Sequence, residues 1–276
     1  KHRLWRWFDD RLPISGFIKA SMTEYYTPKN FNFWYFFGSL ALLVLVIQFL
    51  SGIFLLTHYV GDGADAFTSV QRTIMYDVKW GWLIRYIHTT GASMFFIIIY
   101  LHIFRSYLYG SFHKPRELLW VIGWAIYITL MAESFFGYIL PYGNMSFWGA
   151  KVIVNVIGSI PYVGDYLGSI VRGGSGVGGP TVTRFMAFHV VLIPLILLAI
   201  VMVHLVALHQ VGSNNPDGIE IMDKLDDEGR PLDGIPFHPY FTVKDIFGVG
   251  VFLVVFAAII FYAPTLKGLF IELDNY

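Results

Sequence analysis

Four histidines stand inside long apolar stretches of the sequence, where ionisable side chains are rare and usually functional. His88 and His102 are 14 residues apart in one stretch, and His189 and His204 are 15 residues apart in another. At about 100° and 1.5 Å per residue, an α-helix returns each pair to roughly one face and separates its members by about 21 to 22 Å. The sequence therefore predicts two helices that each carry imidazoles at two levels.

Two facing imidazoles suit a planar macrocycle with an axial ligand on each side, whereas zinc requires four ligands. The chain has no cysteine, which excludes thiolate iron–sulfur clusters, disulfides and the covalent attachment of c-type haem. We therefore expect two non-covalent haem b groups. His88 and His189 would ligate the iron nearer the outer face of the membrane, and His102 and His204 would ligate the iron nearer the inner face, in the orientation argued below. The alternative is that these histidines form buried hydrogen bonds or a proton relay.

Glycines repeat at the same interval in two further apolar stretches. Gly38 and Gly52 are 14 residues apart, and so are Gly123 and Gly137. Glycine inside a helix costs about 1 kcal/mol relative to alanine, but small residues let bulky groups approach a helix backbone. We expect Gly52 and Gly137 to make room for the outer macrocycle. Gly38 and Gly123 would make room for the inner one, although ordinary helix packing is the alternative.

Arginines flank the histidines on the sides where anionic haem propionates would need partners. Arg85 comes three residues before His88, and Arg105 comes three residues after His102. Both guanidinium groups could bind a propionate, and Arg184 could assist at the outer level. The alternative is that these arginines extend toward the membrane surface.

The elements that must hold these side chains are membrane helices. The 276 residues are 56% hydrophobic and 14% charged, compared with about 25% charged in soluble domains. This composition excludes a disordered chain, a secreted disulfide scaffold, a coiled coil and a nucleic-acid-binding module. Five stretches reach the roughly 20 apolar residues that a membrane span needs, namely Phe33–Leu56, Tyr86–Leu108, Leu118–Leu140, Phe185–Leu208 and Ile246–Tyr262.

Positive charge indicates the orientation of these spans. If the N-terminus is inside, the inner segments hold 12 lysines and arginines and the outer segments hold 7, so we expect a cytoplasmic N-terminus. The outer connection between the third and fourth spans is long and has apolar residues at helical spacing, which predicts amphipathic surface helices at about 142–172.

The predicted fold is an all-α polytopic membrane protein with a four-helix haem-binding bundle and a fifth transmembrane helix. Its parts follow the chain in order: an inner N-terminal segment at 1–32, the bundle at 33–208, an inner loop at 209–245, the fifth span at 246–262 and the start of an outer loop at 263–276.

Several stretches resemble the cytochrome b family of quinol–cytochrome c oxidoreductases, over essentially the whole chain. They are "WGWLIRYIHTTGASMFFIIIYLHIFR", "GYILPYGNMSFWGA", "FHVVLIPLILLAIVMVHLVALHQVGSNNPDG" and "FHPYFTVKDIFG". The resemblance implies that His88 and His189 ligate a low-potential outer haem, and that His102 and His204 ligate a high-potential inner haem.

The sequence also departs from members of that family. The interval of 15 between His189 and His204 resembles bacterial rather than mitochondrial members, and Tyr142 and Asn144 replace the usual Trp and Gln. Family members continue with an acidic Pro-Glu-Trp-Tyr segment and three more helices. We expect a longer chain or a second polypeptide to supply that segment.

The resemblance also implies two quinone sites, each of which needs a group that exchanges protons and a flat apolar slot. At the inner site His209 and Asp245 would contact the quinone carbonyls and exchange protons, with Ser213, Ser39 and Trp34 lining the pocket. Asp245 opens the predicted fifth span, so an alternative or additional role is to cap that helix. At the outer site Phe135, Tyr138, Gly149 and Ala150 would form one wall.

These inferences predict the haem and quinone subunit of a proton-translocating quinol–cytochrome c oxidoreductase, with ubiquinone as the expected quinone. Expected partners are a Rieske iron–sulfur protein, a c-type cytochrome and a second copy of the complex, but no nucleic acid. The expected location is the bacterial inner membrane rather than the mitochondrial one. The alternative function is a transmembrane di-haem ferric or oxygen reductase, although no glycine-rich dinucleotide motif accompanies the haem stretches.

Overall fold

The structure is a computed structural model that describes residues 3–266. Within that range, five helices are long and apolar enough to cross a membrane: Phe33–Leu56, Gly81–Leu108, Glu117–Ile139, Gly179–Val211 and Phe237–Tyr262. The predicted all-α membrane fold with five spans is therefore confirmed, and the chain is a multi-pass membrane protein. The predicted loop that continues past residue 266 lies outside the described residues.

The second and third spans are single α-helices, whereas the first and fourth join consecutive helical segments of different type. The first consists of the 3-10 turn η2 (Phe33–Tyr35) and α3 (Phe36–Leu56), the second is α5 (Gly81–Leu108) and the third is α6 (Glu117–Ile139). The fourth joins α9 (Gly179–Ala187), the π-helical segment η4 (Phe188–Leu192) and α10 (Ile193–Val211). Its start matches a helix signal, because Pro180 occupies the first turn, where a missing N–H costs nothing.

The fifth span, α11 (Phe237–Tyr262), begins nine residues before the predicted start at Ile246. The segment from Phe237 to Lys244 is polar enough to resemble the end of the inner loop, yet it is already helical apart from the extended backbone of His238. Asp245 therefore lies inside the helix rather than at its start. The prediction that Asp245 opens the span and caps it is wrong.

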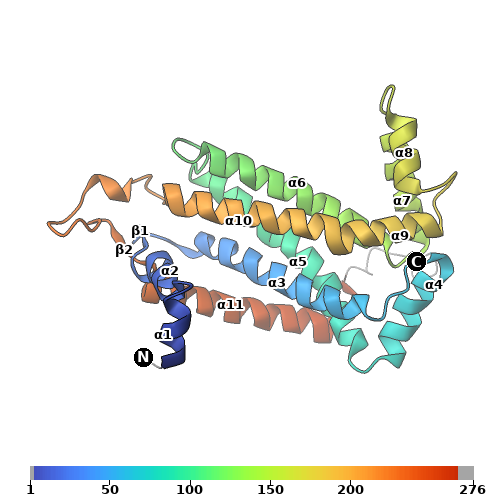
Figure 1. Ribbon diagram of the computed structural model, residues 1–276, viewed down its shortest axis with the longest axis horizontal. Helices are drawn as coiled ribbons and strands as arrows, with labels where there is room; N and C mark the ends of the chain where they lie inside the picture. Colours follow the sequence, from blue (N-terminus) through green and yellow to red (C-terminus); the bar gives the residue numbers. More distant parts are fainter. Residues whose placement is uncertain (1–2, 267–276) are drawn as a thin grey trace. The chain divides into compact units, whose positions relative to one another are not determined.

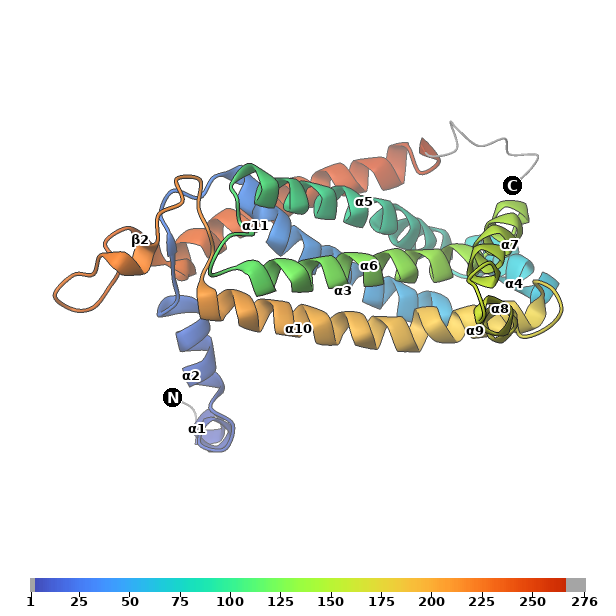
Figure 2. The same ribbon diagram turned by 90° about the horizontal axis from the view of Figure 1, so that it is seen from above.

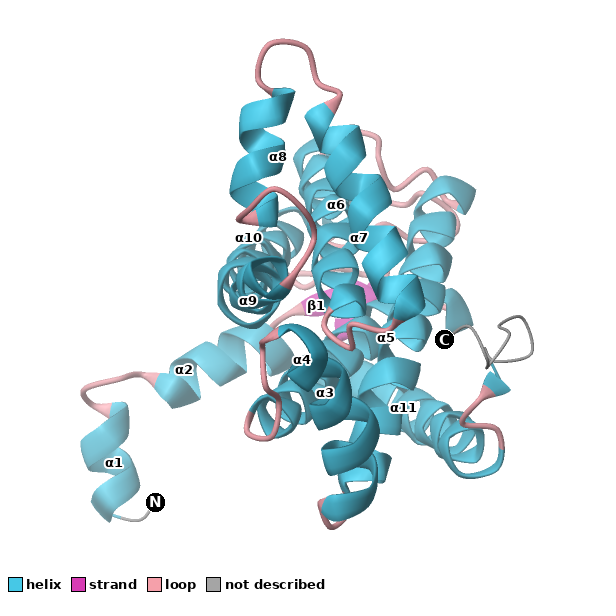
Figure 3. Cartoon of the chain, turned by 90° about the vertical axis from the view of Figure 1, so that its right-hand side faces the viewer, coloured by secondary structure: helices cyan, strands magenta, loops and turns pink. Residues whose placement is uncertain are grey.

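The shorter elements are α1 (Arg3–Asp9), α2 (Ile14–Ile18), η1 (Lys19–Thr23), β1 (Tyr26–Pro28), α4 (Gly63–Thr68), η3 (Ser69–Asp77), α7 (Asn144–Gly158), α8 (Gly164–Arg172), η5 (Ile221–Asp223) and β2 (Gly234–Pro236). The helices α7 and α8 lie where surface helices were predicted at about 142–172. Figure 3 shows them as a hairpin whose turn contains Pro161, which ends the first helix.

The chain folds into two compact units, and the boundary between the units falls within each of the five spanning helices. Among the described residues, the first comprises 3–42, Ile97–Ile122 and Val203–Val254, and the second comprises Leu43–Phe96, Gly123–Met202 and 255–266. His102 and His204 belong to the first unit, whereas His88 and His189 belong to the second.

In the first unit, a two-stranded sheet joins the N-terminal segment to the predicted inner loop (Figure 1). The strands β1 and β2 pair antiparallel with Thr27 opposite Ile235, and Thr27 is 2% exposed. The sequence analysis did not predict this sheet, because three-residue strands carry no recognisable alternation.

A buried arginine holds the rest of that loop. Arg116 is only 5% exposed and donates to a Glu220 carboxylate oxygen at 2.6 Å and to the Gly212 carbonyl at 2.9 Å. Asn215, which is fully buried, donates to the Ile219 carbonyl at 2.6 Å. These side chains supply the hydrogen bonds that an irregular segment cannot make with itself.

In the second unit, parts of α3, α5, α6 and α10 lie side by side (Figures 1 and 2). Ile139, Ala150, Val154 and Phe185 form a fully buried cluster that joins α6, α7 and α9. The Tyr59 hydroxyl donates to the Leu140 carbonyl at 2.7 Å and closes the end of α6. The unit therefore offers a packed frame for the histidines on α5 and η4.

Replacing Arg116 should loosen the inner loop. Arg116→Ala leaves the Gly212 carbonyl and the Glu220 carboxylate without their donor, and we expect a loss of about 1–3 kcal/mol. Thermal unfolding in detergent and limited proteolysis between residues 212 and 236 measure it. The control is Arg230→Ala, which removes an exposed arginine that pairs with Asp226 and should change stability by less than about 1 kcal/mol. Equal proteolysis of both variants would contradict the role of Arg116.

Candidate functional site

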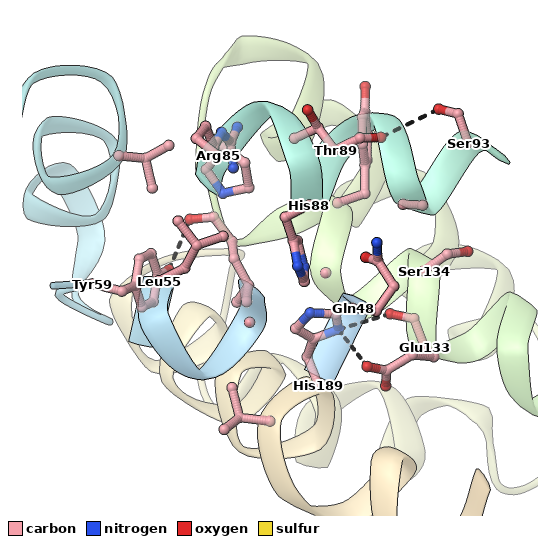
Figure 4. Close-up of a pocket in the computed structure, with 18 of the residues that line it drawn as sticks. Gln48, Leu55, Tyr59, Arg85, His88, Thr89, Ser93, Glu133, Ser134 and His189 are labelled. Carbon is pink, nitrogen blue, oxygen red and sulfur yellow. Dashed lines mark hydrogen bonds and ion pairs between the residues drawn. The ribbon is translucent and has the colours of Figure 1, made fainter. Parts of the chain in front are cut away.

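His88 on α5 and His189 on η4 line one cavity of about 860 Å³ in the second unit. Their ring centres are 6.1 Å apart and their planes are nearly perpendicular, at 88° (Figure 4). Two imidazoles that bind one metal ion from opposite sides, with metal–nitrogen bonds of about 2 Å, have ring centres about 6 Å apart. The pair is therefore spaced for a single iron between two axial ligands.

The Nδ1 atom of His189 is already engaged by α6. It lies 3.0 Å from the backbone carbonyl oxygen of Glu133 and 3.0 Å from a carboxylate oxygen of the same residue. A carbonyl oxygen can only accept, so Nδ1 must carry the proton and donate it. The lone pair of the neutral ring is then on Nε2, where a metal can bind.

The same logic holds for His88. The Ser51 hydroxyl lies 2.9 Å from Nδ1 of His88 and 2.6 Å from the Ile47 carbonyl. If the Ser51 proton goes to that carbonyl, the Ser51 oxygen accepts the Nδ1 proton of His88, and the lone pair of the His88 ring is then on Nε2. For His189 the contact with the Glu133 carbonyl requires this tautomer.

Three of the four predicted glycines lie against these histidines. A Cβ atom on Gly137 would stand 2.5 Å from Cε1 of His189, one on Gly52 would stand 3.2 Å from His88, and one on Gly38 would stand 3.4 Å from His102. At Gly137 the backbone therefore approaches the imidazole more closely than a Cβ atom would permit, whereas the contact would be tight at Gly52 and ordinary at Gly38. Gly123 lies within α6, and its role stays a prediction.

The inner histidines, His102 and His204, lie in the first unit and are arranged differently. An Arg105 nitrogen donates to Nδ1 of His102 at 3.3 Å, and Nδ1 of His204 is buried, with the Leu119 backbone as its nearby polar group. Arg105 also lies over the ring of Tyr35 at 4.9 Å. The glycine at position 38 beside His102 fits a haem, whereas Arg105 would have to release His102.

The predicted outer arginine, Arg85, lines the same cavity as His88. Arg184 donates to the Pro180 carbonyl at 3.1 Å, within its own helix. Arg85 is therefore placed to meet an anionic group in the cavity.

The predicted inner quinone residues form two contact groups in the first unit. The Ser39 hydroxyl donates to a carboxylate oxygen of Asp245 at 2.6 Å, which joins α3 to α11. The ring of His209 stacks on Tyr25, with centres 4.3 Å apart. Burial raises the pKa of the Tyr25 phenol, and the nearby Ser213 side chain opposes that shift.

Trp34 belongs to an aromatic group with Phe37 and Phe104, at ring-centre distances of 5.9 and 5.4 Å. The structure thus places it at the start of the first span and packed against α5. Its predicted contact with quinone stays a prediction.

The predicted outer wall is partly in the cavity. Phe135 and Tyr138 line it, and Gly149 lies against the Tyr138 ring, since a Cβ there would meet that ring at 3.5 Å. Ala150 is instead fully buried in the core cluster with Ile139 and Phe185, so it packs against α6 and α9. The cavity therefore combines the two imidazoles with an aromatic wall, as expected of a slot for a flat apolar ligand.

Sequence reasoning missed three polar residues at the outer pair. Glu133 and Ser51 contact the histidines, and Gln48 lines the cavity with a side-chain nitrogen that is buried and has no hydrogen-bond partner among residues 3–266. Glu133 gave a signal, because an acid within an apolar span is a functional candidate in the same way as a histidine. Ser51 and Gln48 gave none, since neither side chain is ionisable.

Comparisons with known proteins agree with this arrangement. The family described as Cytochrome b/b6/petB matches residues 22–212. Cytochrome b of Allochromatium vinosum is 55% identical over 275 residues, which cover 98% of this chain and 66% of that protein. Cytochrome b of Rickettsia conorii is 50% identical over 270 residues, with 98% and 65% covered.

A solved chain from a "Hyperthermophilic respiratory Complex III" has the same fold, with a TM-score of 0.85 at 37% identity. The match covers 98% of this chain and 69% of that one. The chain spans about two thirds of the length of the curated relatives it matches.

Adding one methyl group at Gly137 should disturb the outer site. Gly137→Ala would force the His189 ring or α6 to move, at a cost of about 1–3 kcal/mol. We expect an altered optical spectrum or reduced content of one haem. The control is Gly250→Ala on α11, where a Cβ atom meets nothing within 4 Å. Normal spectra in both variants would show that the close approach at Gly137 has no bearing on cofactor binding.

Proposed function

Because the chain belongs to the cytochrome b/b6 family, we propose that it is the haem- and quinone-binding subunit of a quinol–cytochrome c oxidoreductase. In this proposal, electrons from quinol oxidation at the outer face pass through two b haems to quinone reduction at the inner face. Proton uptake inside and release outside couple the reaction to proton translocation. The match to a respiratory Complex III chain supports this assignment.

The observation that carries the proposal is the outer imidazole pair. The ring centres of His88 and His189 are 6.1 Å apart, and donation of the Nδ1 proton to the Glu133 carbonyl leaves Nε2 of His189 unprotonated. A bound haem b supplies a one-electron Fe(III)/Fe(II) couple. In this proposal the chain holds His189 in one tautomer, and the cavity around both ligands is lined mostly by apolar side chains.

At the inner level, His102 and His204 would ligate the second haem. Arg105 is the nearest cation to His102, and its Nε atom is buried without a partner in the described range. Once it releases His102, its guanidinium group is available to pair with a propionate. Gly38 leaves the space that the His102 ring and a macrocycle edge would share.

Quinone reduction at the inner face requires two protons, and Asp245 and His209 are the proposed carriers. Asp245 accepts the Ser39 hydroxyl proton in a hydrogen bond, so its carboxylate is oriented and has a second oxygen for a quinone or for water. His209 is exposed at the end of α10 and stacked on Tyr25. An imidazole at that end of the span is a group that can take up and release a proton.

The proposal extends to the surroundings of the chain. A Rieske iron–sulfur protein and a c-type cytochrome would accept electrons at the outer face, since the chain has no cysteine to hold either centre. Ubiquinone is the proposed quinone and the complex is proposed to be a dimer. The proposed location is the bacterial cytoplasmic membrane with the N-terminus inside, on the basis of the distribution of lysine and arginine.

Haem content tests the proposal directly. We expect two haems per copy of the protein, extractable with acid acetone because the chain has no cysteine for a thioether bond. A pyridine haemochrome assay on the purified complex, corrected for the c-type partner, gives the ratio. One b haem per copy, or none, would contradict the two-level assignment.

The role of Asp245 gives a second test. Asp245→Asn keeps an oxygen for the Ser39 hydroxyl but cannot donate and recover a proton near neutral pH. We expect inner-haem reoxidation by quinone to slow by about 10- to 100-fold, at the lower end of the effect of a positioned acid or base. Haem content should not change, and a diffusible weak acid should restore part of the rate.

The matched control is Asp233→Asn, which removes an acid of the same inner segment that pairs with Lys29 at 2.8 Å. That variant should reoxidise its inner haem at the wild-type rate. A wild-type rate in Asp245→Asn as well would mean that another group delivers the protons.

A further inference from the structure

We propose that the Glu133 side chain positions and polarises His189, and so lowers the reduction potential of the outer haem. The inference rests on the proposed function, because it requires a haem between His88 and His189. Glu133 is on α6, whereas the histidines are on α5 and η4, so the acid contributes from a third element of the second unit.

The contact between the acid and the imidazole is double. Nδ1 of His189 lies 3.0 Å from the backbone oxygen of Glu133 and 3.0 Å from its Oε1 atom, and Figure 4 shows both interactions converging on one ring nitrogen. The backbone carbonyl alone suffices to fix the tautomer. The carboxylate of Glu133 is therefore not needed to orient the ring. What it adds is a negative charge beside Nδ1 of His189.

That charge is poorly solvated. The side chains of His189 and Glu133 are each 17% exposed, and Oε2 of Glu133 is buried without a hydrogen-bond partner in the described structure. An acid in the apolar part of a membrane span is costly unless a partner offsets its charge. Nδ1 of His189, 3.0 Å from Oε1, is placed to do so, and iron bound by His189 would strengthen the interaction.

The two ligands of the outer site differ in this respect. Ser51 gives His88 a neutral oxygen as acceptor, whereas Glu133 gives His189 a carboxylate. An imidazole whose N–H is held by a carboxylate is a more basic ligand than one held by a neutral oxygen. A more basic ligand and a nearby anion both favour Fe(III) over Fe(II), so the potential falls.

The direction of the effect suits the position of the site. In the proposed function electrons move from the outer level to the inner level, so a more reducing outer couple suits that direction. A carboxylate beside the outer ligand His189 favours Fe(III) at that level and so widens the difference between the two couples.

The experiment is a redox titration of both b haems in membranes that contain the full-length protein and its complex. Glu133→Gln removes the charge and keeps an oxygen that can accept the Nδ1 proton. We expect the outer haem to shift toward Fe(II) by about tenfold in its equilibrium, which is a rise of about 59 mV for one electron. The inner haem of the same molecule should keep its potential.

The matched control is Ser134→Ala, the next residue on α6. Its hydroxyl donates to the Met131 carbonyl and it lines the same cavity, but it is neutral, so we expect no shift. An unchanged outer potential in Glu133→Gln, or an equal shift in Ser134→Ala, would overturn the inference while leaving the proposed function intact. Absence of an outer haem in the wild type would refute the proposed function itself.

A third variant keeps the test decisive if Glu133→Gln fails to bind haem. Glu133→Asp retains a carboxylate on a side chain one methylene shorter and should keep the outer haem with a smaller rise in potential. A rise by the full tenfold in Glu133→Asp, although the carboxylate is retained, would contradict the electrostatic role.

Discussion

The outer site depends on a hydrogen-bond constraint that begins with two backbone carbonyls. The Glu133 carbonyl accepts the Nδ1 proton of His189, and the Ser51 hydroxyl lies 2.6 Å from the Ile47 carbonyl and 2.9 Å from Nδ1 of His88. Because a carbonyl cannot donate, the Glu133 contact fixes the tautomer of His189. The helices that supply these carbonyls therefore decide which imidazole nitrogen faces the cavity. The hydrogen-bond partners of both imidazoles thus depend on the packing of α3 against α5 and of α6 against η4.

Close backbone approach is the second part of that constraint. Gly52 and Gly137 bring α3 and α6 against the imidazoles, and a larger residue at either position would move the carbonyl or the serine out of reach. The π-helical segment η4 contains His189, and a π-turn accommodates one residue more than an α-turn. This is a physical reason for the interval of 15 residues between His189 and His204, where the other helix has 14 between His88 and His102.

In the first unit, polar groups are held by a different device. The pairing of β1 with β2 holds the end of the inner loop that precedes α11, and the buried Arg116 holds the start of that loop at Gly212. Because α11 starts at Phe237 rather than at Ile246, Asp245 is carried on a regular helix and meets Ser39 from α3. A carboxylate on a rigid element, oriented by a hydroxyl, is better placed for repeated proton exchange than one on a mobile loop.

The sequence by itself determined the five apolar spans, because hydropathy and length follow directly from composition along the chain. The spacing of histidines and glycines likewise predicted which residues share a helix face, since the helical period is fixed. The tertiary structure alone decided the partners of each imidazole: Glu133 and Ser51 are 56 and 37 residues from the histidines they contact. It also decided that Ala150 packs in the core and that Asp245 lies inside a helix. Such contacts depend on how helices rotate and approach one another, and no local pattern in a single sequence encodes that rotation.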